Sequence, residues 1–308
     1  MGTYYRVNLA SLPAAMSEIE LQEIIDGRLE NVDSLMSSYK SESEVSRFNR
    51  YLDTDWFPVS ADTAVVVAEA LKIYELSEGA FDITVSPLVD LWGFGPSKRK
   101  GIIPSPAAIE DALRNTGSEH LSARLSPPGL KKKNGDLQID LSGIAKGFAV
   151  DSVAKSLESL GIVDYLVDVG GEMIAGGLKL DSSPWKIAIE SPTAEESGIQ
   201  RVLALSDQAI ATSGDYRNYF EVDGQRYSHE IDPRSGLPIR HRLVSVSVLN
   251  ASCMRADAWA TALIVLGSQR GMQVAEGASL STFLIVKGDE GFLEMESSRF
   301  KLSSVLSD

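Results

Sequence analysis

The stretch Tyr219-Phe220-Glu221-Val222-Asp223-Gly224-Gln225-Arg226-Tyr227-Ser228 decides the fold class, because it predicts two antiparallel strands joined by a tight turn. Its central dipeptide, Asp223-Gly224, favours the positive φ angles of a two-residue type I′ turn. Counting outward from that turn places Asn218 opposite His229. We therefore expect His229 to leave the hairpin beside polar groups.

Helices and further strands surround this hairpin without a regular alternation. Helical spacing of apolar residues predicts helices over 17–36, 62–77, 143–160 and 254–266, the first with Ser17 and Glu20 as a capping box. Apolar extended runs predict strands over 137–141, 165–169, 185–190, 202–205, 244–249 and, last in the chain, 281–286. Residues 127–136 are expected to form a long turn. This mixture favours an α+β fold with a largely antiparallel sheet flanked by helices.

Composition excludes several functional classes. The 308 residues include 29 Lys and Arg against 43 Asp and Glu, a formal net charge of −14, which opposes nucleic-acid binding. The longest uncharged apolar runs are far too short to span a membrane. One cysteine and three histidines make a classical zinc centre a poor fit, so any metal should be a hard cation bound by oxygen. A phosphorylated ligand would then need a metal, local cations or backbone N–H groups.

The segment from Asp140 to Phe148 lies where a predicted strand meets a predicted helix. Unpaired N–H groups at a helix start favour an anion, the two glycines Gly143 and Gly147 admit close approach, and Lys146 adds a positive charge. The alternative is a tight turn with a solvated lysine. Asp168-Val169-Gly170-Gly171-Glu172 is similarly either a ligand contact or a simple turn.

His229 precedes a constrained turn, Glu230 to Pro238, that can hold a base rigidly. A histidine packed in the core is the alternative reading. His120 and His241 lack comparable surroundings and are expected at the surface.

Asp257 and Thr261 stand four residues apart on a predicted helix rich in alanine. Both oxygens therefore face one direction with only small side chains between them, a geometry that suits a hard cation such as Mg²⁺. The alternative is an exposed aspartate and a threonine bonded to its own helix.

Read together, these segments resemble the FAD:protein FMN transferase (ApbE-type) family. Eight blocks carry the resemblance in order along nearly the whole chain, which makes the joint signal far more specific than any one block. They are Met1–Thr3, Ser38-Tyr39 with Ser43–Asn49, Gly79–Val85, Asp140–Gly147, Asp168–Glu172, Ala211–Tyr216, His229–Gly236 and Asp257–Ala262.

The resemblance implies a T-fold-like domain over 1–308, with a helical and strand lobe at about 1–135 and an FMN- and metal-binding lobe at about 136–308. FAD would lie in a cleft between these sub-structures. The implied enzyme uses Mg²⁺ to break the pyrophosphate of FAD and attaches FMN to a threonine or serine hydroxyl of a partner flavoprotein, releasing AMP. The implied acceptors are membrane redox subunits of the sodium-pumping NADH:quinone reductase (Nqr) or Rnf type.

The resemblance also assigns roles to residues of this chain. Asp257 and Thr261 would bind Mg²⁺ together with a backbone carbonyl in the Gly143 turn, and His229 would be the base that activates the acceptor hydroxyl. Asp257 and His229 are thus the two catalytic candidates. The residues expected to contact the flavin or adenosine portions are Met1, Tyr39, Ala80, Phe81, Asp82, Lys146, Gly171 and Ile231.

Two other functions stay open. An Mg²⁺-dependent FAD pyrophosphatase would use the same residues and release free FMN and AMP. A flavin carrier would bind without turnover, which leaves the metal pair and His229 unexplained. Met1 to Arg6 shows no basic and apolar leader. The resemblance nevertheless implies a periplasmic protein, tethered to the inner membrane by a lipid anchor that would precede the first block.

Overall fold

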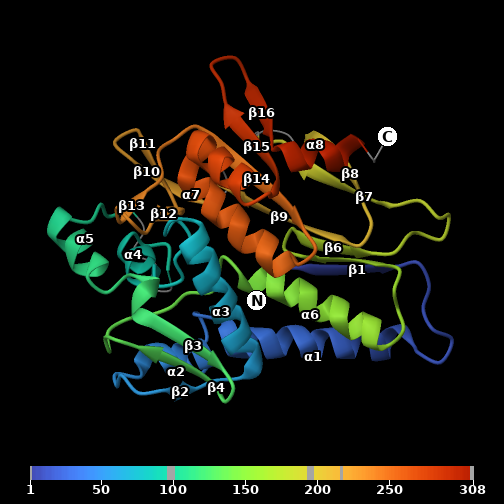
Figure 1. Cartoon of the computed structure of the whole chain (residues 1–308), viewed down its shortest axis with the longest axis horizontal. Coiled ribbons are helices and arrows are strands. Elements are labelled where there is room, and N and C mark those ends of the chain that lie inside the picture. The colour runs from blue at the N-terminus through green and yellow to red at the C-terminus, as the bar shows by residue number, and fades with distance from the viewer. Residues whose placement is uncertain (1, 96–100, 193–197, 216–217, 306–308) are drawn as a thin grey trace.

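A seven-stranded sheet organises the computed structural model, which describes residues 2–95, 101–192, 198–215 and 218–305 (Figure 1). Every neighbouring pair in this sheet runs antiparallel, so the predicted α+β class with a largely antiparallel sheet is confirmed. In sheet order the strands are β1 (Tyr5–Leu9), β5 (Tyr165–Val169), β6 (Glu172–Gly176), β9 (Gln208–Gly214), β14 (Leu243–Asn250), β15 (Ser281–Lys287) and β16 (Phe292–Glu296).

Helices and smaller sheets surround this sheet. The helices are α1 (Glu18–Met36), α2 (Glu44–Arg50), α3 (Ala61–Leu76), α4 (Ser86–Leu91), α5 (Pro106–Leu113), the 3₁₀ turn η1 (Ser118–His120), α6 (Ala145–Ser159), α7 (Cys253–Gly277) and α8 (Ser298–Val305). The remaining strands are β2 (Phe57–Pro58), β3 (Leu121–Leu125), β4 (Pro128–Lys132), β7 (Trp185–Glu190), β8 (Ile199–Leu205), β10 (Tyr219–Val222), β11 (Gln225–Ser228), β12 (Ile231–Asp232) and β13 (Leu237–Pro238).

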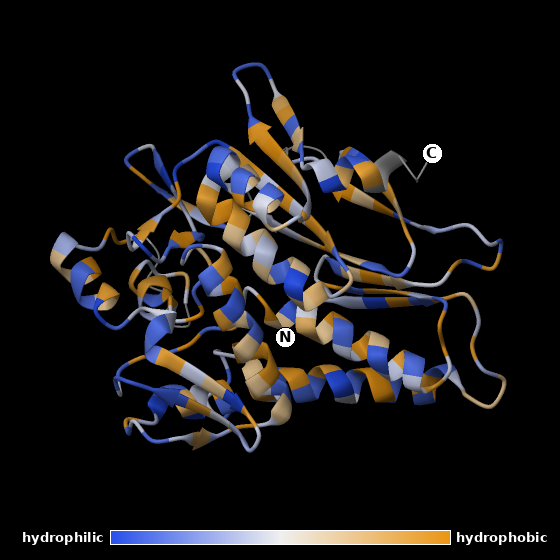
Figure 2. Ribbon diagram, in the orientation of Figure 1, coloured by the Kyte–Doolittle hydropathy of each residue, from blue (hydrophilic) through white to orange (hydrophobic). Residues whose placement is uncertain are grey.

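The central strands of the large sheet are buried on both faces. On one face α7 packs on β9 and β14, α6 packs on β5 and β6, and α1 lies against α6 (Figure 1). Val246 and Val248 of β14 join Leu263 of α7 in this core. On the other face, Phe283 of β15 packs with Phe300 of α8 and Trp185 of β7. Figure 2 shows hydrophobic residues along the central strands and the helices that cover them, as burial on both faces requires.

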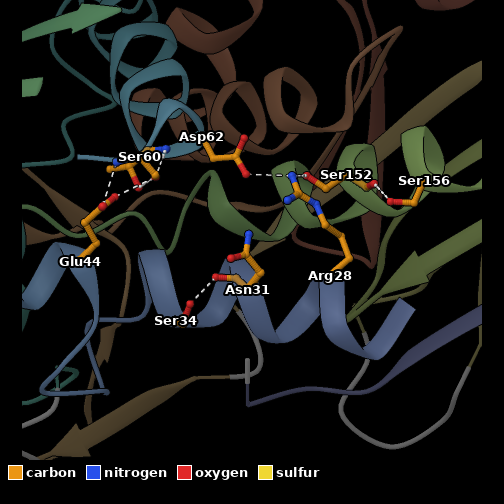
Figure 3. Close-up of polar contacts among 9 residues, drawn as sticks. Arg28, Asn31, Ser34, Glu44, Ser60, Asp62, Ser152 and Ser156 are labelled. Carbon is orange, nitrogen blue, oxygen red and sulfur yellow. Dashed lines mark hydrogen bonds and ion pairs between the residues drawn. The ribbon is translucent and has the colours of Figure 1, made fainter. Parts of the chain in front are cut away.

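Polar contacts fix the helices beside the sheet (Figure 3). Arg28 of α1 donates to Asp62 at the start of α3 at 2.9 Å and to Ser152 of α6 at 3.2 Å. Glu44 of α2 accepts hydrogen bonds from the backbone N–H and hydroxyl of Ser60, the N-cap of α3. These bonds join four helices and so hold α6, whose first turn opens the site described below.

Several predicted elements are confirmed. The capping box of Ser17 and Glu20 begins α1. Asp223 and Gly224 have φ angles of 53° and 75°, as a type I′ turn requires, and the hairpin has the predicted register. His229 donates its backbone N–H to the carbonyl of Asn218 at 3.1 Å, so those two residues lie opposite one another.

Other predicted elements are wrong. Residues 137–141 form no strand, because the side-chain amide of Asn49, rather than a neighbouring strand, bonds both the N–H and the carbonyl of Ile139. The expected turn over 127–136 contains strand β4. The helix ending at Gly267 is interrupted there by a φ of 77° but resumes to Gly277. The strand expected to be last in the chain is followed by β16 and α8.

No helix in the described ranges combines the length and apolar character needed to cross a membrane. The division of the chain near residue 135 stays a prediction. Met1, one of the predicted contact residues, lies outside the described residues.

Candidate active site

A cavity of about 520 Å³ lies where α6, α7, β6, β9 and the turn after β11 meet. The predicted site residues come from distant parts of the chain, yet all that the structure describes line this single cavity. They are Tyr39, Ala80, Phe81, Asp82, Gly143, Lys146, Gly171, His229, Ile231, Asp257 and Thr261. The structure therefore brings the predicted metal, nucleotide and base residues together.

The predicted metal ligands lie where the start of α6 meets α7. The backbone N–H of Gly147 donates to Oδ2 of Asp257 at 2.9 Å, and Asp257 is only 3% exposed. Thr261 lies one turn further along α7, and its hydroxyl is 3.3 Å from the hydroxyl of Ser213 on β9. A Cβ atom at Gly143 would lie 3.1 Å from Oγ1 of Thr261, so a side chain there would crowd this approach.

Close helix packing creates this arrangement. A Cβ atom at Gly147 would lie 2.3 Å from the carbonyl oxygen of Cys253, so a larger residue there would force the helices apart. Asp151, one turn further along α6, accepts hydrogen bonds from the backbone N–H groups of Cys253 and Met254 and from the Ser252 hydroxyl. It thereby caps the N-terminus of α7 and fixes the helix that carries both ligands.

Lys146 forms an ion pair with Glu172 inside the cavity. Its Nζ lies 2.6 Å from Oε1 of Glu172, which is only 2% exposed. Burial alone would lower the pKa of Lys146, but the carboxylates of Asp257 and Glu172 outweigh it and raise that pKa. Burial and the charge of Asp257 raise the pKa of Glu172, while Lys146 opposes them. Lys146 is therefore positively charged at neutral pH.

The carboxylates of Glu172 and Asp257 can accommodate a further cation besides Lys146. Oε2 of Glu172 is buried and has no hydrogen-bond partner among the described residues. Burial raises the pKa of Asp257, an effect that Lys146 and the Gly147 N–H reduce. In the described part of the chain, no three His, Cys, Asp or Glu side chains form a ready metal cluster. The donor set instead offers one carboxylate and one hydroxyl, which suits a hard cation that keeps waters and binds ligand phosphates.

His229 is fixed by the residue opposite it in the hairpin. Its Nδ1 lies 2.9 Å from the carbonyl oxygen of Asn218, and its ring packs edge-on against Phe94. Because a carbonyl can only accept, we assign the proton to Nδ1 and the lone pair to Nε2. The ring is therefore held with an unprotonated nitrogen available at the cavity.

The predicted nucleotide contacts differ in their exposure and in whether their polar groups are already hydrogen-bonded. Tyr39 is 65% exposed and lies at the rim of the cavity. Asp82 lines the cavity, but its carboxylate accepts hydrogen bonds from Thr84 and Ser118, so it shapes the loop that holds Ala80 and Phe81. A Cβ atom at Gly171 would meet nothing within 4 Å, which shows open space in front of its backbone.

Sequence reasoning did not assign site roles to Glu172, Glu230, Asp140 or Ser213, all of which line the cavity. The available signal was their position inside the quoted blocks, beside residues that were assigned roles. The surface prediction for His120 is confirmed by a side chain that is 44% exposed. The one for His241 is wrong, because both its ring nitrogens are buried against the kink at Gly267.

Known proteins resemble the chain over almost its whole length. A family model described as the ApbE family matches residues 1–284. The FAD:protein FMN transferase of Vibrio cholerae is 48% identical across 98% of this chain and 90% of that protein, and the one of Escherichia coli K12 is 41% identical across 98% and 86%.

Solved structures agree. The flavin transferase ApbE from Vibrio cholerae superposes with a TM-score of 0.91 at 46% identity, covering 98% of this chain and 96% of the other. The apo form of the Pseudomonas stutzeri flavinyl transferase ApbE gives 0.91 at 39% identity, covering 99% and 94%. Because the family model and these relatives extend over nearly all of the sequence, the chain belongs to the ApbE family.

Proposed function

We propose that the chain transfers FMN from FAD to a threonine or serine hydroxyl of a partner flavoprotein in an Mg²⁺-dependent reaction that releases AMP. The observation that carries this proposal is the single cavity in which buried Asp257 and half-buried Thr261 lie beside charged Lys146 and the fixed ring of His229. Its relatives are named FAD:protein FMN transferase, which supports the same reaction.

Asp257 and Thr261, with a backbone carbonyl near Gly143, would hold Mg²⁺. When bound, the cation would neutralise pyrophosphate oxygens and lower the barrier to displacement at phosphorus. The chain's own contribution is to place the carboxylate and hydroxyl on one face of α7 and to keep the opposing position free of a side chain at Gly143. Lys146, directed by Glu172, adds a positive charge for the nucleotide phosphates.

His229 supplies the base. The acceptor hydroxyl oxygen attacks the riboflavin-side phosphorus and forms the new P–O bond, while its proton moves to Nε2 of His229. The bond to the bridging oxygen breaks, and AMP leaves with that electron pair. A histidine suits this step because its ordinary pKa lies close to neutral pH. Tyr39, Ala80, Phe81, Gly171 and Ile231 would contact the flavin and adenosine parts.

We further propose acceptors of the Nqr or Rnf type and a periplasmic enzyme tethered to the inner membrane. The family resemblance supports both. Fractionation of cells that express the native gene would test the location, and recovery of the protein with the cytoplasmic fraction would contradict it.

The function can be tested by incubating the chain with FAD and Mg²⁺, with and without a threonine-bearing domain of an Nqr-type subunit. Transfer predicts a covalently flavinylated, fluorescent acceptor and equimolar AMP. Release of AMP and free FMN without labelling would indicate the pyrophosphatase, and unchanged FAD would indicate a carrier. His229→Ala and Asp257→Asn should each lower labelling by about 100-fold or more, and a chelator should stop it reversibly. The control Glu221→Gln, on an exposed hairpin position, should leave labelling unchanged.

A further inference from the structure

The carboxylate of Glu230 faces the nitrogen of His229 that serves as the base. Oε1 of Glu230 lies 3.4 Å from Nε2 of His229, and the Glu230 side chain is only 14% exposed. The two side chains line the same cavity. A carboxylate thus stands at ion-pair distance from the nitrogen on which the acceptor's proton arrives.

Structural contacts do not account for this mostly buried carboxylate. The backbone of Glu230 is fixed independently, because its N–H donates to the Ser228 hydroxyl and its carbonyl accepts from Ile239. Among the described residues, the carboxylate has one ion-pair partner, His229, and accepts no hydrogen bond. Burial of a charged group with so few partners costs folding free energy, so a role in function explains its presence better than a role in stability.

The electrostatic surroundings favour a proton near this pair. Burial raises the pKa of Glu230, and Asp215 adds to that effect while His229 opposes it. Asp257 also raises this pKa, and Lys146 lowers it. A carboxylate in such surroundings gains most when its histidine neighbour becomes positively charged.

We propose that Glu230 is a positioning residue that pairs with the imidazolium form of His229 created during transfer. This inference rests on the proposed function. The Asn218 carbonyl holds Nδ1–H, the acceptor proton moves to Nε2, and the new Nε2–H donates to Oε1 of Glu230. The electron pair of the acceptor O–H bond becomes the new P–O bond, and AMP carries away the electrons of the bond that breaks. Glu230 lowers the energy of the charged histidine and leaves the other bonds unchanged.

The test compares steady-state FMN transfer to the Nqr-type acceptor domain by the wild-type chain and by Glu230→Gln, Glu230→Asp and Glu221→Gln. We expect Glu230→Gln to lower kcat by about 10-fold or more with KM for FAD within twofold, because only the transition state carries the new charge. Glu230→Asp keeps the charge and should recover part of the rate. Glu221→Gln removes the same charge from an exposed position of the same hairpin and should match the wild type.

A double-mutant cycle with His229→Ala separates this role from a structural one. In the His229→Ala background, where no imidazolium forms, Glu230→Gln should change the residual rate by less than twofold. Equal losses in both backgrounds, a wild-type rate for Glu230→Gln, or a loss confined to KM would overturn the inference while the proposed function stands. If the wild-type chain labels no acceptor, the proposed function falls and this inference falls with it.

Discussion

The backbone N–H of Gly147 and the carboxylate of Asp257 are joined by a hydrogen bond of 2.9 Å, so the first turn of α6 directly holds the residue proposed to bind the metal. This bond requires the helices to approach more closely than any side chain at residue 147 allows. Stability and the geometry of the site therefore depend on the same close contact.

Gly147→Ala should lower the stability of the chain and disturb the geometry of the site. The added methyl group would overlap the Cys253 carbonyl, and overpacking of this kind costs about 1–3 kcal/mol in the free energy of unfolding. Denaturant unfolding measures the stability, and acceptor labelling should fall in parallel because Asp257 moves. Gly27→Ala, at an exposed helical position with nothing within 4 Å, is the matched control and should stabilise the chain by up to about 1 kcal/mol. Equal behaviour of the two variants would refute the packing argument.

Lys146→Met should destabilise the chain by about 3 kcal/mol at neutral pH. Burial and Asp257 raise the pKa of Glu172 to about 8 even with Lys146 beside it. Without its cation, the buried carboxyl must take up a proton or stay charged and unpaired, and removal of one partner of a buried ion pair is costly. The double variant Lys146→Met/Glu172→Gln removes both charges and should recover most of the loss in chemical denaturation. Additive losses in the double variant would show that the pair does not act as a unit.

Arg28→Met should lower the free energy of unfolding by about 1 kcal/mol, because it removes the ion pair to Asp62 and the hydrogen bond to Ser152. Both side chains of the ion pair are partly solvated, which keeps the effect modest. Lys155→Met, an exposed cation on α6, should change stability by less than about 0.5 kcal/mol. Equal effects of the two variants in urea titrations would contradict a specific role for Arg28.

Because of Lys132, the free energy of unfolding should depend on pH in the alkaline range. It is fully buried, its Nζ donates to the carbonyls of Phe48, Asn49 and Leu137, and burial lowers its pKa to about 8 from 10.5. Between these values the unfolded chain binds more protons than the folded chain, so the free energy of unfolding rises with pH.

Comparison with Lys132→Met isolates this contribution. The stability of the wild type relative to the variant should increase by up to about 1.4 kcal/mol per unit between pH 8 and 10 and stay level below that window. A difference that stays constant or falls across the window, measured by denaturant unfolding at each pH, would exclude the lowered pKa.

Local signals in the sequence were sufficient where neighbouring residues determine the structure. The Asp223-Gly224 turn and the Ser17 capping box depend on residues within three positions, and both are confirmed. The strand expected at 137–141 was wrong because its backbone bonds to Asn49, about 90 residues earlier, which no local pattern reveals. β4 was missed because its proline and glycine are also the residues of turns.

For the site as well, features set by neighbouring residues were predicted and features set by distant contacts were not. Helical spacing placed Asp257 and Thr261 on one face of a helix, and the residues named from the ordered blocks line one cavity in the structure. Neither source could show that Glu172 is buried and Glu230 mostly buried, because burial of a charged residue depends on packing between distant segments. Those two carboxylates contribute much of the charge in the cavity. Their partners, Lys146 and His229, are visible only in the structure.

The pairing of β1 with β5 has a consequence for how the chain is made. Tyr5 pairs with Val169, so β1 leaves the ribosome long before its partner strand is translated. At about 5–20 residues per second this delay is roughly ten to thirty seconds. During that time β1 is an unpaired edge, and its alternating exposed positions carry Arg6 and Asn8, polar residues that oppose pairing with other chains. The large sheet can therefore close only after the second half of the chain has been made.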